Sequence, residues 1–108
     1  MNKEIYKKLQ EVAKSGNVTN YSDIAPLANL DMSNPDDRNK ISVILDEISE
    51  KEHEEGRPLL STVVIHKDNN MPGKGYFKMA KRIGLHTGND DFMFYINELR
   101  KVHNYYKA

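Results

Sequence analysis

The sequence predicts a helix-rich α+β fold with a small antiparallel sheet and an added C-terminal helix. Apolar residues recur at helical spacing through most of the chain, which predicts amphipathic helices. One β-branched run, residues 59–66, is typical of a strand. The length of 108 residues suits one domain with one core, so we expect a single domain over residues 1–108.

The first two helices follow from spacing and capping residues. Ile5, Leu9 and Val12 lie on one face of a helix predicted over residues 2–14. A short second helix is expected over residues 21–25, because the preceding Thr19 and Asn20 are residues that cap helix starts. Residues 29–34 are then expected to form a loop.

A third, longer helix has the clearest start. Residues 33–37 provide a cap, a proline at the first helical position and two acids at the positive end of the helix dipole. We expect the helix to run to about Glu55 and to stop at Gly56. Its buried face is predicted to contain Ile41, Ile44, Leu45 and Ile48.

The second half of the chain predicts a strand, a turn-rich loop and two helices. The strand over residues 59–66 needs a partner, either a short antiparallel return near residues 75–77 or a strand that the sequence does not reveal. A helix is expected from about Phe77 to Gly84. Asn89 or Asp90 is expected to cap the last helix, over residues 89–106, whose predicted stripe is Phe92, Ile96, Leu99, Val102 or His103, and Tyr106.

Composition excludes several kinds of chemistry. With no cysteine, the chain cannot form disulfides, use a thiolate nucleophile or bind zinc through thiolates. None of the four histidines forms a His-Glu-x-x-His pair, so no metal or other cofactor is expected. The N-terminus does not resemble a signal peptide, and no apolar run is long enough to span a bilayer. These features predict a small soluble cytoplasmic protein without membrane contact.

Charge is unevenly distributed although the formal net charge is zero. Residues 31–56 contain nine acidic residues and three basic ones, whereas residues 57–87 contain six basic residues and one acidic one. Such a bipolar chain can present one basic face. The same charges could instead form a solvated surface of salt bridges.

The phrase over residues 18–25, with Tyr21, resembles the start of the second helix in one DNA-binding family. That family is the O6-alkylguanine DNA alkyltransferases and alkyltransferase-like proteins. Arg38 falls where the family has the arginine that fills the base stack, and residues 73–76 resemble the end of its wing. The resemblance covers residues 18–84 and implies a winged helix that binds DNA. Residues 59–64 lack the family's Pro-Cys-His-Arg motif, so alkyl transfer to cysteine is excluded.

The leading expectation is therefore non-catalytic binding of double-stranded DNA, in a regulatory or alkyltransferase-like role. Lys74, Lys78 and Lys81 share a helical face and could neutralise phosphates, and asparagines at the loop tip could enter a groove. The alternative is that these lysines only cover the outer face of a helix. The predicted nucleic-acid-binding residues are Tyr21, Arg38, Lys67, Asn69, Asn70, Lys74, Lys78, Lys81 and Arg82.

Two other classes of function stay open. A protein-interaction or regulatory module would use the acidic third helix and the aromatic C-terminal helix, either with a protein partner or by self-association. Its predicted partner-binding residues are Phe94, Tyr95, Tyr105 and Tyr106. A small enzyme would use His66 as a general base, with Ser61 or Thr62 on the strand and Glu52 or Glu55 nearby. No catalytic residue is assigned, because neither a nucleophile motif nor a metal-ligand motif is present.

Overall fold

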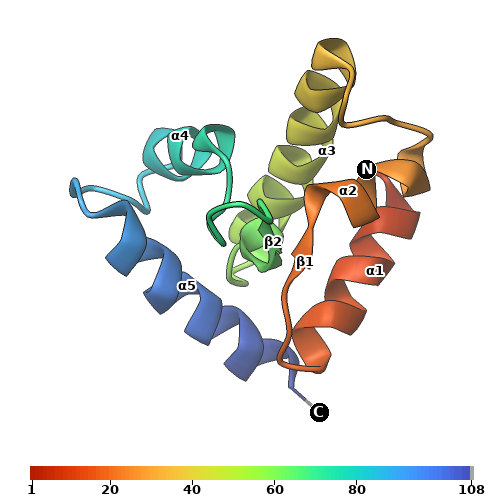
Figure 1. Cartoon of the computed structure of the whole chain (residues 1–108). Helices are drawn as coiled ribbons and strands as arrows, with labels where there is room; N and C mark the ends of the chain where they lie inside the picture. The colour runs from red at the N-terminus through yellow and green to blue at the C-terminus, as the bar shows by residue number, and fades with distance from the viewer. Residues whose placement is uncertain (108) are drawn as a thin grey trace.

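Helices form most of the structure, a computed structural model that describes residues 1–107. Among these residues the long α3 runs through the middle, with α1 and α2 on one side and α4 and α5 on the other (Figure 1). The elements in chain order are α1 (Lys3–Lys14), β1 (Thr19–Asn20), α2 (Tyr21–Ile24), the 3-10 turn η1 (Ala25–Ala28), α3 (Pro35–Glu54), the 3-10 turn η2 (Leu60–Val63), β2 (Val64–Ile65), α4 (Lys74–Arg82) and α5 (Asp91–Tyr106).

The helix starts follow the capping residues of the sequence. The Asn34 side chain accepts the Asp36 N–H at 2.9 Å, and Pro35 takes the first position of α3, as expected. Asp90 caps α5 by accepting the Met93 N–H at 3.0 Å. Gly56, just beyond α3, has a φ of 77°, a left-handed conformation that favours glycine. The predictions for the start and end of α3 and for the cap of α5 are confirmed.

The prediction of an antiparallel sheet is wrong. β1 pairs with β2 in parallel, with Thr19 opposite Val64 and Asn20 opposite Ile65. Parallel strands need a crossover connection, and here α2, η1 and α3 provide it. The return strand expected near residues 75–77 does not exist, because α4 already begins at Lys74.

The strand predicted over residues 59–66 is mostly replaced by η2. Side chains from distant helices bind its backbone instead of a neighbouring strand: Glu98 accepts the Leu59 N–H at 2.9 Å, and Ser49 accepts the Ser61 N–H at 3.0 Å. Because these two N–H groups already have side-chain acceptors, strand pairing with β1 is limited to Val64 and Ile65.

The core has two adjoining parts. One lies between α1, α3, η2 and α5, and it includes Ile5, Ile48 and Val102, all fully buried. The other joins α4 to α5 through Phe77, Met79 and Tyr95. The predicted stripe of α5 is partly wrong, since Phe92 is 57% exposed and the buried positions are Tyr95, Glu98, Val102 and Tyr106.

Within residues 1–107, none of the helices combines the length and the apolar character needed to cross a membrane.

Candidate nucleic-acid interface

The loop between β2 and α4 is tied to α2 by Tyr21. The Tyr21 hydroxyl accepts the Gly73 N–H at 2.8 Å, and its ring lies 4.5 Å from the His66 ring, centroid to centroid. At the other end of the loop, the His66 N–H donates to the Met71 carbonyl and the Asn70 N–H to the His66 carbonyl, both at 2.9 Å. The predicted wing is thus a closed loop rather than a β-hairpin.

Tyr21 has a structural position in this arrangement. Its side chain is partly buried, burial raises the pKa of its hydroxyl, and that hydroxyl binds the protein's own backbone. Gly73 packs so closely here that a Cβ atom would lie 3.1 Å from His66 Nε2 and 3.2 Å from the Tyr21 hydroxyl. Tyr21 therefore holds the loop in place, whichever ligand the loop meets.

The basic residues of the loop and α4 lie at the surface. Lys67, Lys74, Lys78 and Lys81 are exposed, and within residues 1–107 no carboxylate lies within 4.0 Å of their amines. Asn69 and Asn70 are exposed beside Lys67. We name the set Lys67, Lys74, Lys78 and Lys81 the basic face.

Arg82 differs from these lysines because its guanidinium pairs with Glu50 of α3. Two neighbouring acids also have partners of their own: Glu47 of α3 binds the N-terminal amine at 2.8 Å, and Glu55, just after the helix, binds Lys51 at 3.1 Å. Of the predicted set, Arg82 is thus paired with an acid of α3, whereas the lysines of the basic face have no carboxylate within 4.0 Å among residues 1–107. Arg38 is exposed near the start of α3.

A small hollow lies between α2, α3, η2 and α4. Its lining residues are Tyr21, Ser42, Leu45, Asp46, Ser61 and Tyr76, and its volume is about 10 Å³. This is about the space of one water molecule, so the hollow holds no larger ligand. Burial raises the pKa of Asp46 to about 6, while Arg82 acts in the opposite direction. The sequence pattern did not indicate Asp46, because its burial depends on the approach of α4.

The groups proposed for an enzyme around His66 do not come together. The Ser61 hydroxyl lies 2.5 Å from the Ser49 hydroxyl, and the Thr62 hydroxyl lies 2.6 Å from that of Tyr76. Glu52 binds Tyr6, Tyr106 and Arg57 instead. In the part of the chain that the structure describes, no three His, Asp or Glu side chains are grouped to hold a metal ion.

The aromatic residues of α5 divide into buried and exposed. Tyr95 and Tyr106 are 5% and 8% exposed, which corrects the prediction that they face a partner. Phe94 stacks on the His86 imidazole at 4.5 Å and is half-buried. Tyr105, at 54% exposed, is the member of this set whose ring is open to solvent.

No protein-family model matches the chain, and neither a curated protein nor a solved structure gives a match.

Proposed function

We propose that this protein binds double-stranded DNA without catalysis, through phosphate contacts made by the basic face. The observation that carries the proposal is the lysine row of α4. Lys74, Lys78 and Lys81 repeat at one helical face, are exposed and have no carboxylate within 4.0 Å among residues 1–107. Ammonium groups in such a row can replace the counterions of a phosphate backbone.

The loop before α4 extends this surface. Lys67 adds a fourth amine, and the exposed Asn69 and Asn70 lie at the tip, where amide groups can reach sugar or base edges. Because Tyr21 and His66 hold the base of the loop, it would meet the duplex in one conformation. Little conformational entropy is then lost on binding.

The acids of α3 set a limit on how the duplex can lie. Asp36 and Asp37 stand in the first turn of α3, where a recognition helix would enter the major groove, and Glu50 occupies Arg82. A duplex lying along α4 and the loop avoids the first of these charges, whereas one centred on α3 does not. We therefore expect backbone binding with little sequence preference, in which Arg38 contributes only at the edge.

The test is the salt dependence of binding to a duplex of about 20 base pairs, measured by fluorescence anisotropy. Each phosphate contact contributes about 0.9 to the slope of log affinity against log salt. Replacing Lys74, Lys78 and Lys81 together by alanine should therefore lower the slope by about 2 to 3. At physiological salt the wild-type dissociation constant is expected at roughly 10⁻⁴ to 10⁻⁶ M.

The matched control replaces three lysines of α1 by alanine. Lys3, Lys7 and Lys14 share an exposed face of α1, and their triple alanine variant has the same change in net charge. It should keep the wild-type slope. Absence of binding at low salt, or an equal loss in both triple variants, would contradict the proposal.

A further inference from the structure

A groove runs along the second half of α5 and is lined by none of the lysines of the basic face. Its volume is about 650 Å³, within the range of sites that enclose a ligand group. The walls come from α5, from the end of α3 and the segment that follows it, and from the loop before α5. The lining residues are His53, Gly56, Arg57, Pro58, Leu85, Glu98, Lys101, Asn104 and Tyr105.

The apolar part of the groove is open to solvent. Leu85 is 38% exposed and Tyr105 is 54% exposed, and the half-buried Pro58 lines the same groove. A large apolar side chain of a ligand would cover these surfaces. An aromatic ring beside aliphatic groups is the composition typical of the central part of protein interfaces.

The buried end of the groove contains a carboxylate with one acceptor to spare. Glu98 is 4% exposed, and its Oε2 accepts the Leu59 N–H at 2.9 Å. Within residues 1–107, the other polar partner of this carboxylate is the Lys101 amine, which lies 3.8 Å from Oε1, longer than a hydrogen bond. Oε1 therefore remains open to an N–H donor from the groove.

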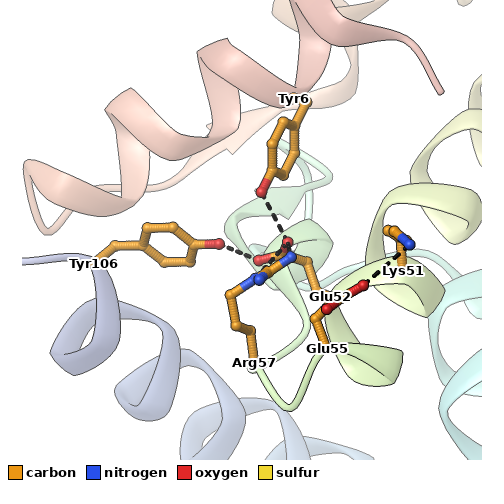
Figure 2. Close-up of polar contacts among 6 residues, drawn as sticks. All are labelled: Tyr6, Lys51, Glu52, Glu55, Arg57 and Tyr106. Carbon is orange, nitrogen blue, oxygen red and sulfur yellow. Dashed lines mark hydrogen bonds and ion pairs between the residues drawn. The ribbon is translucent and has the colours of Figure 1, made fainter.

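The charges at the rim favour an anion over a cation. Arg57 has its charge balanced by the buried Glu52, which also accepts from Tyr6 and Tyr106 (Figure 2). Lys101 has a side chain that is 69% exposed and only loosely paired with Glu98. A ligand carboxylate at the rim would pair with Lys101, while an amide N–H below it would donate to Glu98.

We propose that this groove binds a peptide segment of another protein in which an apolar residue lies next to an acidic one. The apolar side chain packs against Leu85, Pro58 and Tyr105, its backbone N–H donates to Glu98 Oε1, and the acidic side chain pairs with Lys101. This surface shares no residue with the basic face. A partner could therefore be held while the protein is on DNA, and the groove would stand even if DNA were not the ligand.

The experiment selects nine-residue peptides from a random displayed library on the full chain. Enriched peptides should share an aliphatic or aromatic residue adjacent to Asp or Glu. A synthetic enriched peptide should lose at least about tenfold in affinity for both Tyr105→Ala and Lys101→Glu, which corresponds to about 1.4 kcal/mol. Methylation of the backbone nitrogen at its apolar residue should cause a loss of similar size.

Two variants on the same helix serve as matched controls. Arg100→Glu makes the same charge change as Lys101→Glu outside the groove, and Phe92→Ala removes an equally exposed aromatic ring. Both should bind the peptide like the wild type. The proposal is overturned if no shared pattern is enriched, or if Arg100→Glu weakens binding as much as Lys101→Glu. It is also overturned if the free chain forms a dimer that Tyr105→Ala dissolves, because the occupant is then a second copy.

Discussion

Near the C-terminal end of α3 a buried carboxylate joins α1, α3 and α5, whereas α4 packs on α3 and α5 through apolar residues and exposes its charged residues. Glu52 is fully buried and accepts from Tyr6 of α1, from Tyr106 of α5 and from Arg57 (Figure 2). α4 buries Tyr76, Phe77, Met79 and Ala80 and exposes its lysines. The charged groups of the first region hold the fold together, whereas in the second the α4 lysines have no carboxylate within 4.0 Å among residues 1–107.

The largest expected effect comes from breaking the Glu52 cluster. Glu52→Ala leaves two tyrosine hydroxyls and the Arg57 guanidinium without their acceptor, and of these the Arg57 side chain is 27% exposed. Water therefore solvates part of the freed cation, so we expect the free energy of unfolding to fall by about 3 kcal/mol, the lower end of the effect of breaking a buried ion pair. Urea denaturation of the variant and the wild type measures this difference.

An exposed carboxylate on the same helix sharpens the comparison. Glu47 pairs with the N-terminal amine, and its side chain is 55% exposed. Glu47→Ala should therefore change the unfolding free energy by less than about 1 kcal/mol. If Glu52→Ala were no more destabilising than Glu47→Ala, the cluster would not be what joins α1, α3 and α5.

A smaller effect is expected where the loop meets α2. In Gly73→Ala the new methyl group would lie 3.1 Å from His66 Nε2 and 3.2 Å from the Tyr21 hydroxyl, so these two side chains must move by a few tenths of an ångström. Overpacking of this kind costs about 1 to 3 kcal/mol of unfolding free energy. Thermal or urea unfolding gives the value, and the Tyr21 ring signals in NMR spectra should move with it.

Gly88→Ala is the control for this substitution. A Cβ atom at Gly88 has nothing within 4 Å, and its φ is not in the left-handed region. Its unfolding free energy should stay within about 0.5 kcal/mol of the wild type. Equal stability of the two alanine variants would show that the loop is not held by the Tyr21 and His66 contacts.

The helices were predictable because their signals are local. A capping side chain and a proline at the start of α3 act within one turn, and the lysine spacing of α4 needs only helical geometry. The strand was misread for the opposite reason. The segment predicted as a strand over residues 59–66 has backbone N–H groups bound by side chains of other helices, Leu59 by Glu98 and Ser61 by Ser49.

The predicted site residues also divide into those that depend on local helix geometry and those that depend on contacts between helices. Exposure of the α4 lysines follows from their helical face, but the pairing of Arg82 with Glu50 exists only because α3 and α4 pack together. In α5 the hydrophobicity pattern does not predict that Glu98 is buried, because carboxylates rarely occupy buried positions. The spacing from Tyr95 to Glu98 and Val102 would have indicated its face.

The last expected effect depends on pH and concerns Asp46 of α3, which lies near Arg82 of α4. Burial raises the pKa of this carboxyl from an ordinary value of about 3.9 to about 6, so the folded state binds its proton more tightly than the unfolded state. Its contribution to stability is therefore fully present below about pH 4 and is lost as the pH rises through about 6. Asp46→Asn removes this dependence, because an amide does not titrate.

The unfolding free energies of the wild type and Asp46→Asn should differ by an amount that depends on pH. At pH 7.5 the wild type has an ionised, half-buried carboxylate, so Asp46→Asn should be the more stable protein; near pH 4.5 the difference should shift in favour of the wild type. Subtracting the two curves of unfolding free energy against pH cancels the contributions of the other carboxylates, which both proteins share. Asp46 also lies near the positive charge of Arg82, which lowers its pKa. If the difference in unfolding free energy between the two proteins did not change with pH, the Arg82 guanidinium would offset the effect of burial. Charge pairing would then contribute to the contact between α3 and α4, as it does in the Glu52 cluster.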